Sequence, residues 1–308
     1  MNQDPPVQGS SRSEQSGRAR GGIAVVTDSS ASLPVDPATG QSTDELACGR
    51  VVVLPLPVDI AERTYDEIGP ELDHALTMAL AMGTPVRTSR PSPGRVGEAF
   101  ASLAAAGYEG IVAVHLSSRL SGTVDAAELA AGEAELPVIT VDSRQTGYSL
   151  GHAVLDAAGC AAGGGSLEEV AAAARRTAGR AESLFVVPHL DQLRRGGRIN
   201  AAASLIGNLL SVKPLLGIDD GAVSVRERPH SLQRALDRLF ERATTAIGGE
   251  QRSRVVVHSC GNRAQGEEFA QRLQEGLSVD VPVVELPPVL AAHLGLGALG
   301  VCISPPAV

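Results

Sequence analysis

Four hydroxyl side chains lie close together between an apolar run and a helical pattern. Ser117, Ser118, Ser121 and Thr123, with Gly122 among them, follow the apolar run GIVAVHL in the stretch SSRLSGT. One hydroxyl is enough to cap a helix, and Ser121 or Thr123 is suited to that position. The other hydroxyls, with a glycine that lets the backbone come close, are typical of an anion site at a helix N-terminus. The local sequence fits both interpretations.

A second polar stretch, RTSRPSPG, contains Thr88 and Ser89. Its two prolines, Pro91 and Pro93, stiffen the chain and suit the first turn of a following helix. The stretch is therefore either a rigid connector or a second contributor of hydroxyls to the same ligand site.

His293 lies in the glycine-rich stretch LAAHLGLGALG near the end of the chain. A lone histidine is more often structural than functional, but the glycines around it indicate a backbone that closely approaches another group. Beside a carboxylate, a histidine can donate a hydrogen bond or carry a compensating charge.

Three arginines, including Arg198, flank two glycines in the stretch LRRGGRIN. Such a stretch suits a solvated turn, a phosphate site or a contact with an acidic partner, and the sequence leaves these three interpretations open.

Ser149 lies in GYSLG, which matches the G-x-S-x-G pattern of serine hydrolases. A nucleophile requires a sharp turn between strand and helix, whereas the pattern around Ser149 is already helical. A hydrolase using Ser149 is therefore kept only as an alternative.

The composition excludes several classes of function. The 308-residue chain has a net charge of −9 and only 2% aromatic residues, which argues against nucleic-acid binding. No apolar run has the length of a membrane span, and neither a metal-ligand set nor a phosphate-binding glycine loop is present. We therefore expect no cofactor and no stable membrane insertion. The four cysteines are far apart, and residues 1–21 are polar. We expect a cytoplasmic protein with a disordered tail at 1–21.

The order of the expected elements predicts an α/β fold with two domains. Residues 22–180 alternate strands and helices, which predicts a mainly parallel sheet with helices on both faces. Three expected strands end in the hydroxyl-rich segments TDSS, HLSS and VDS. These segments follow the carboxyl ends of the strands, which is the edge of a parallel sheet where ligands bind. Ser166 and Glu169 form an expected capping box. Residues 181–308 predict an α+β domain with a mixed sheet, a helix at 200–210 and a hairpin turn at DDG.

Seven of these motifs occur in a fixed order. They are VVTDSSASLP, TSRPSPG, LSSRLSGT, VDS, LRRGGRI, KPLLGIDDG and HLGLGALG, which extend over nearly the whole chain beyond the tail. In this order they resemble the DegV family of fatty-acid-binding proteins. The resemblance implies that a long-chain fatty acid is buried in a tunnel between the two domains. It also implies that the carboxylate is held by residues Thr88, Ser89, Ser117, Ser118, Ser121, Gly122, Thr123 and His293.

Members of this family serve as the acceptor subunit of a fatty-acid kinase. The resemblance therefore implies a non-catalytic carrier that presents the carboxylate to a separate ATP-dependent kinase. Arg198, Arg228 and His230 are the implied partner-binding residues. His230 and Ser231 stand where family members commonly have an Arg-Thr pair, so either Arg228 takes over the contact or the contact differs. The remaining alternative is a carrier of another amphipathic carboxylate without a kinase partner.

Overall fold

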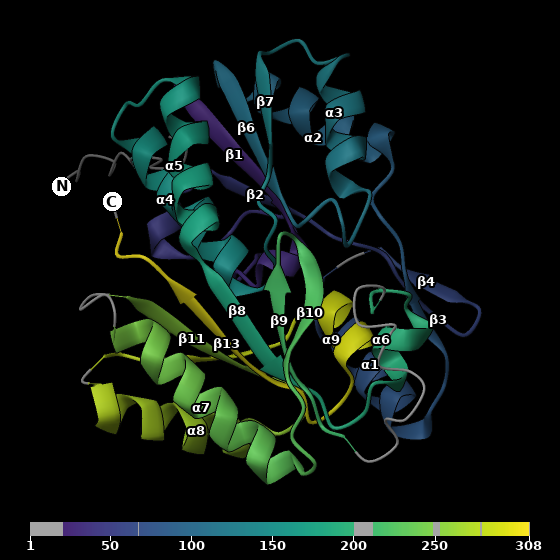
Figure 1. Cartoon of the computed structure of the whole chain (residues 1–308). Coiled ribbons are helices and arrows are strands. Elements are labelled where there is room, and N and C mark those ends of the chain that lie inside the picture. The colour runs from purple at the N-terminus through teal and green to yellow at the C-terminus, as the bar shows by residue number, and fades with distance from the viewer. Residues whose placement is uncertain (1–20, 67, 200–211, 249–252, 278, 308) are drawn as a thin grey trace, which may run out of the picture.

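The computed structural model describes residues 21–66, 68–199, 212–248, 253–277 and 279–307. The expected helix at 200–210 and residues 1–20 of the expected tail lie outside these ranges. Two sheets form the framework, and helices cover them in layers (Figure 1). Four strands from the first half of the chain form one of these sheets, and six strands from the second half form the other. The α/β architecture expected from the sequence is confirmed.

The first sheet has four parallel strands in the order β2-β1-β6-β7. Its strands are β1 (Ile23–Asp28), β2 (Val51–Leu54), β6 (Gly110–His115) and β7 (Val138–Asp142). One face packs against α2 (Pro93–Ala105) and α3 (Thr123–Ala131), and the other against α4 (Tyr148–Ala162) and α5 (Leu167–Arg180). Successive residues of β1 pack into the two different cores, as the two-residue period of a strand requires.

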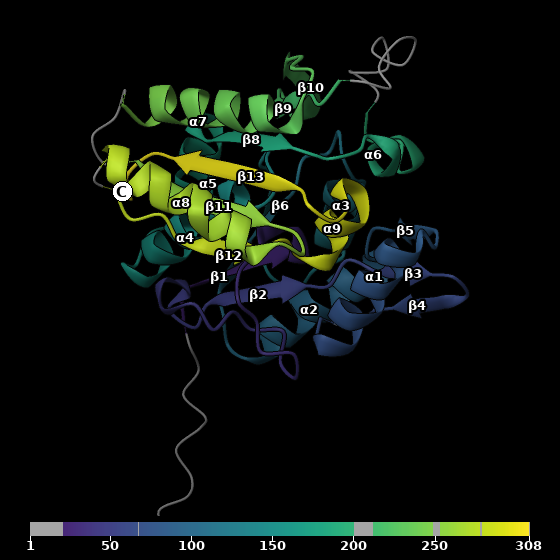
Figure 2. The same cartoon turned by 90° about the horizontal axis from the view of Figure 1, so that it is seen from below.

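The second sheet is mixed and has six strands in the order β10-β9-β8-β13-β11-β12. Its strands are β8 (Glu182–Val186), β9 (Leu215–Asp219), β10 (Ala222–Glu227), β11 (Arg254–Ser259), β12 (Val283–Glu285) and β13 (Leu299–Ser304). Two helices, α7 (Leu232–Gly248) and α8 (Arg263–Leu277), cover one face (Figure 2). The opposite face is turned toward the rest of the molecule, where the cavity described below lies.

A third layer of short elements lies beside both sheets. It contains the sheet β4-β3-β5 and three helices. These elements are β3 (Val58–Ile60), β4 (Arg63–Tyr65), β5 (Val86–Thr88), α1 (Pro70–Met82), α6 (Asp191–Arg195) and α9 (Pro288–Leu294). Two single turns of 3-10 helix, Ser29–Ala31 and Glu45–Ala47, complete the described elements. The apolar run RVVVLPLPVDI, residues 50–60, reads as one extended segment but forms two strands, because the chain between β2 and β3 passes from one sheet to another. Pro55 and Pro57 in this link have no N–H to donate to a ladder.

Local predictions at two turns are confirmed. The Ser166 hydroxyl accepts from the Glu169 N–H, and the Glu169 carboxylate accepts from the Ser166 N–H, which is the expected capping box. Asp220 and Gly221 connect β9 to β10 as a two-residue turn, both with positive φ. The domain division near residue 180 stays a prediction, although α5 ends at Arg180 and β8 begins at Glu182 in the other sheet.

Within the described ranges, no helix combines the length and apolar character needed to cross a membrane. The same residues contain no group of three or more His, Cys, Asp or Glu side chains that could hold a metal ion.

Candidate ligand cavity between the two sheets

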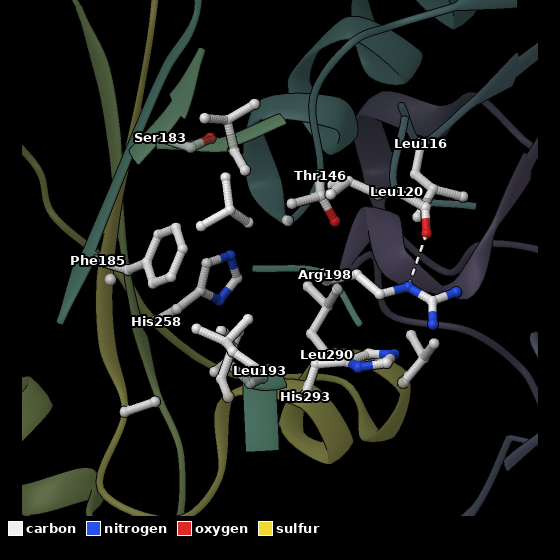
Figure 3. A pocket seen from close by; sticks show the side chains of 18 of the residues that line it. Leu116, Leu120, Thr146, Ser183, Phe185, Leu193, Arg198, His258, Leu290 and His293 are labelled. Atoms are coloured by element: carbon white, nitrogen blue, oxygen red, sulfur yellow. Dashed lines mark hydrogen bonds between the residues drawn. The ribbon is translucent and has the colours of Figure 1, made fainter. Parts of the chain in front are cut away.

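An apolar cavity lies where the second sheet faces the other layers. Its empty volume is about 930 Å³, part of which is open to solvent. Much of the wall is aliphatic, for example Leu56, Leu116, Ile218, Leu290 and Leu299. Polar side chains reach it in two groups, one around His293 of α9 and one on the strands of the second sheet (Figure 3). The lining suits a ligand with a long apolar part and a few polar atoms.

The first polar group is organised by Thr88 and His293, which are 205 positions apart in the sequence. The Thr88 hydroxyl lies 2.8 Å from His293 Nε2 and joins the end of β5 to α9. Burial, helped by the positive charge of Arg198, lowers the pKa of His293 to about 4. The ring is therefore neutral at pH 7 and acts through hydrogen bonds rather than through charge. A side chain at Gly196 would collide with His293 Nδ1, so only glycine lets the backbone pack against the ring.

Arg198 supplies the positive charge at this end of the cavity. Its Nε donates to the Leu120 carbonyl at 3.0 Å, drawn as a dashed line in Figure 3, and its Nη1 donates to the Gly196 carbonyl at 2.5 Å. Both bonds hold the guanidinium in place while the side chain lines the cavity. The resemblance implied a partner contact for Arg198, whereas its position also makes it a counter-charge for an anionic ligand. The sequence did not suggest that role, because nothing in LRRGGRIN shows which arginine points inward.

Ser89 and Ser121 complete this polar group, and both line the cavity. The Ser121 hydroxyl lies 2.8 Å from the Thr123 hydroxyl, so the two hydroxyls pair with each other. The prediction that Ser121 or Thr123 caps the helix is wrong. The N-cap of α3 is Gly122, and no side chain accepts from the first turn. The N–H groups at the start of α3 are thus left without a side-chain cap.

Ser117 and Ser118 bind other parts of the protein and are not among the residues that line the cavity. The Ser117 hydroxyl donates to the Gly221 carbonyl at 2.7 Å, and the Ser118 hydroxyl donates to the Asp142 carboxylate at 2.6 Å. Asp220, next to Gly221, pairs with Arg119 at 3.0 Å and with Arg144 at 2.5 Å. We call the contacts of Ser117, Arg119 and Arg144 with Asp220 and Gly221 the loop–hairpin joint, since they tie the first sheet to the β9–β10 hairpin.

The expected convergence of strand ends in the first sheet is confirmed. Asp28, at the end of β1, is fully buried and lies 2.9 Å from His115 Nδ1 at the end of β6. The same carboxylate accepts from the N–H groups of Ser30 and Leu116. The Asp28 carboxylate thus accepts from groups of both strand ends and ties them together at the edge of the sheet, while His115 Nε2 has no partner among the described residues.

The second polar group of the cavity lies on its far wall and was not expected from the sequence. Ser183, His258 and Cys302 come from the neighbouring strands β8, β11 and β13, and Thr146 comes from the loop before α4. Cys302 and Ser183 are direct partners across the β8–β13 ladder. The signal in the sequence was a set of polar residues inside otherwise apolar strands, which alternation alone does not assign to a ligand.

Ser149 does not have the surroundings of a hydrolase nucleophile. Its side chain is fully buried in the first turn of α4, and its hydroxyl accepts from Ser183 at 2.8 Å. The neighbouring His258 accepts the Tyr148 N–H on Nε2 at 3.0 Å, so this nitrogen is not available as a base. Ser149 is also absent from the lining of the cavity. The expectation of a helical Ser149 is confirmed.

Arg228 and His230 lie away from these groups, in the link between β10 and α7. Both are exposed, and Arg228 borders a shallow hollow on the surface. Arg228 forms no ion pair with any residue in the described ranges, whereas the neighbouring Glu227 pairs with Arg238 and Arg242.

The model of one protein family matches residues 22–306, and it is described as an uncharacterised protein of the DegV family. The chain belongs to the DegV family. The match includes every described strand and helix, so the resemblance of the seven motifs is confirmed at the level of the family.

Relatives of known sequence and structure agree with the DegV assignment. A DegV domain-containing protein of Streptomyces coelicolor is 38% identical over 286 residues, which are 92% of this chain and 98% of the relative. A fatty-acid-binding DegV family protein of Thermus thermophilus has a TM-score of 0.80 at 30% identity, covering 92% of this chain and 99% of that one. DegV of Bacillus subtilis, a fatty-acid-binding protein, has a TM-score of 0.80 at 26% identity with the same coverage. The DegV fold extends through both sheets of this chain.

Proposed function

We propose that this protein binds a long-chain fatty acid in the cavity, with the carboxylate beside Thr88, Ser89 and Arg198. The observation that carries the proposal is a single cation, beside hydroxyl side chains, in a cavity whose wall is mostly aliphatic. Arg198 is the one Lys or Arg among the described residues that line it. The fatty-acid-binding relatives from Thermus thermophilus and Bacillus subtilis support the same ligand class.

The polar end provides what a buried carboxylate requires. Such a group is costly to bury unless it is paired and hydrogen-bonded. Arg198 offers a charge, and the hydroxyls of Thr88, Ser89 and Ser121 offer donors. Because His293 is neutral, its contact with Thr88 orients the hydroxyl instead of adding a second charge. Ser117, Ser118, Gly122 and Thr123 support this end indirectly, through the loop that carries Ser121.

The apolar wall provides the larger share of the free energy of ligand binding. Burial of each CH₂ contributes about 0.8 kcal/mol, so a sixteen-carbon chain gains on the order of 12 kcal/mol before ordering costs. Mass spectrometry of lipid extracted from the natively folded protein tests this proposal. A stoichiometric long-chain fatty acid is expected. A protein that is purified without lipid and that also fails to bind added palmitate and oleate would contradict the proposal.

The protein is proposed to act as a carrier that presents the carboxylate to a separate ATP-dependent kinase, without catalysing the transfer itself. The family resemblance supports this role, and the exposed Arg228 and His230 offer a polar contact for a partner. The test supplies the palmitate-loaded protein, ATP and the kinase subunit of the same organism, and measures acyl phosphate.

Arg228→Ala is expected to lower the rate of acyl-phosphate formation while leaving palmitate affinity unchanged. Arg175→Ala, which removes an exposed arginine from α5, is the matched control and should change neither quantity. If palmitate binds but no acyl phosphate forms with the true partner, the presenting role is wrong and the carrier role stands alone.

A further inference from the structure

Two residues that line the cavity have a buried polar side-chain atom without a hydrogen-bond partner among the described residues. The atoms are His293 Nδ1 and Thr146 Oγ1. His293 belongs to the proposed carboxylate end, where its other nitrogen is bound to Thr88. Thr146 lies in the loop before α4, between Gln145, which accepts from the Ser117 N–H, and Gly147, which packs on the far wall, and the proposed function gives its hydroxyl no role. A buried hydroxyl without a partner costs free energy unless a ligand supplies one.

Thr146 is held firmly against the far wall by its neighbour in the sequence. A side chain at Gly147 would come within 3.1 Å of His258 Nε2 and 3.4 Å of Cys302 Sγ, so the backbone of this loop packs closely on the second sheet. Figure 3 shows the Thr146 oxygen directed toward the cavity rather than into the loop. The hydroxyl therefore lies at the edge of the space that the acyl chain would fill, itself almost fully buried.

The other polar side chains of the far wall already have partners. The Ser183 hydroxyl lies 2.8 Å from the Ser149 hydroxyl and 3.1 Å from Gln145 Oε1. His258 accepts the Tyr148 N–H on Nε2 and lies 3.1 Å from the Val284 carbonyl through Nδ1. These contacts give Ser183 and His258 a structural role, and they leave Thr146 Oγ1 as the unsatisfied group of this wall.

The chemistry of the missing partner follows from the surroundings. A second carboxylate on the ligand would need a second counter-charge, yet Arg198 is the one cation among the described lining residues, and it lies at the other polar group. Both nitrogens of His258 are engaged, so this ring cannot supply that charge without losing a bond. A neutral hydroxyl or oxo group, which can bond to a threonine hydroxyl, needs no counter-charge.

We propose that the cavity favours fatty acids that carry a hydroxyl or oxo group on the chain, and that Thr146 Oγ1 is the hydrogen-bond partner of that group. This inference rests on the proposed fatty-acid binding and adds a determinant of ligand choice. In a purely apolar pocket, a hydroxyl on the chain would weaken binding because it loses its bonds to water. Here the hydroxyl and Thr146 satisfy each other.

The experiment compares the dissociation constants of stearate and of its 10-, 12- and 18-hydroxy derivatives, measured by calorimetry on delipidated protein. At least one derivative is expected to bind about fivefold more tightly than stearate, the factor expected for one net hydrogen bond between neutral groups. Thr146→Val keeps the shape but removes the hydroxyl, and should make every derivative bind more weakly than stearate. Thr146→Ser keeps the hydroxyl and should retain the preference.

The outcomes separate this inference from the function on which it rests. If stearate binds and every derivative binds equally or more weakly, the inference is overturned and fatty-acid binding stands. If the preference is present but Thr146→Val leaves it unchanged, the assignment to Thr146 is wrong. If neither stearate nor any derivative binds, the proposed function fails, and this inference fails with it.

Discussion

The loop–hairpin joint and the polar end of the cavity both use the loop at 117–121, through Ser117 and Ser121, but differ in how their polar groups are used. At the joint, Ser117 donates to Gly221 and the Asp220 carboxylate pairs with two arginines, so the groups satisfy one another. At the cavity, Arg198 keeps its guanidinium beside an apolar space and His293 has an unpartnered nitrogen. A hydroxyl-rich sequence therefore marks an inter-sheet contact as readily as a ligand site, and the contacts of each side chain, rather than its type, distinguish the two.

The largest effect is expected from Gly221→Ala at the joint. Its φ of +80° is strained for alanine, and the added methyl would collide with the Ser117 hydroxyl. Strain of about 1 kcal/mol and a clash of about 2 kcal/mol together predict a loss of about 3 kcal/mol in the free energy of unfolding. Urea denaturation measures the loss.

Gly83→Ala is the matched control for this clash. Gly83 ends α1 with a φ of +71°, and nothing lies within 4 Å of an added methyl. Only the strain of about 1 kcal/mol is expected there. Adding Ser117→Ala to Gly221→Ala should recover part of the loss. Equal losses at Gly83 and Gly221 would show that the joint does not restrict position 221.

The next effect is expected in ligand binding and tests the cavity side of the comparison. Arg198→Met keeps the apolar stem and removes the charge. A charged hydrogen bond contributes about 1.5 to 3 kcal/mol, so palmitate affinity should fall by about 10- to 100-fold. Calorimetry measures this, with the exposed Arg194→Met as control. An unchanged affinity in Arg198→Met would remove Arg198 from the carboxylate site.

The pH dependence of stability should separate a histidine of the cavity from one of the core. Burial, with the charge of Arg198, lowers the pKa of His293 to about 4, and burial near Arg254 lowers the pKa of His152 to about 3. In the unfolded chain both histidines become protonated near pH 6.5, whereas in the folded chain they stay neutral until the pH falls to about 4 or about 3. Stability should therefore fall as pH falls from 6.5 toward 4, by about 1 kcal/mol per pH unit for each histidine.

Bound fatty acid should reduce this slope through His293 alone. The carboxylate offsets the charge of Arg198 and raises the pKa of His293, whereas His152 contacts Ser304 outside the cavity lining. Urea titrations at pH 7, 6 and 5 with and without palmitate measure the change. His293→Asn should abolish the effect of palmitate on the slope, and His152→Asn should keep it. If palmitate still changes the slope in His293→Asn but not in His152→Asn, the carboxylate does not lie near His293.

The smallest effect is expected from Ser118→Ala in the hydroxyl-rich loop. Ser118 is exposed, and its hydroxyl bonds to the Asp142 carboxylate at 2.6 Å, but its N–H keeps a bond to the same group. A loss of about 0.5 kcal/mol in stability and no change in palmitate affinity are expected. A loss of affinity comparable to that of Arg198→Met would return Ser118 to the ligand site.

Much of the fold could be predicted from the sequence, because local patterns there agree with the tertiary structure. Apolar runs of the first half such as GIVAVHL become parallel strands, and the helical pattern around Ser149 becomes α4. The elements α9, β4 and β5 were not predicted from the sequence. The helix α9 could have been recognised, because it begins at Pro288 and is followed by Gly295, which are ordinary start and stop signals. The strands β4 and β5 have three residues each, too few for a period to be recognised.

The candidate site was less predictable, because its geometry depends on contacts between distant segments. Family motifs indicated Thr88 and His293, yet their 2.8 Å contact connects β5 with α9. The inward position of Arg198 depends on the Leu120 carbonyl of the other half of the chain. The unpartnered hydroxyl of Thr146 becomes visible only when its surroundings are known, since a threonine in a loop has no distinguishing pattern.

The central place of β13 in the second sheet has a consequence for how the protein is made. This strand, residues 299–304, lies between β8 and β11 and supplies Leu299, Val301 and Cys302 to the cavity wall. During translation, β8 and β11 leave the ribosome before the strand that must join them. The first sheet has all of its strands by residue 142 and can fold early, whereas the cavity closes only when β13 is inserted. If the proposed function holds, a nascent chain cannot bind a fatty acid until the strand at 299–304 has emerged.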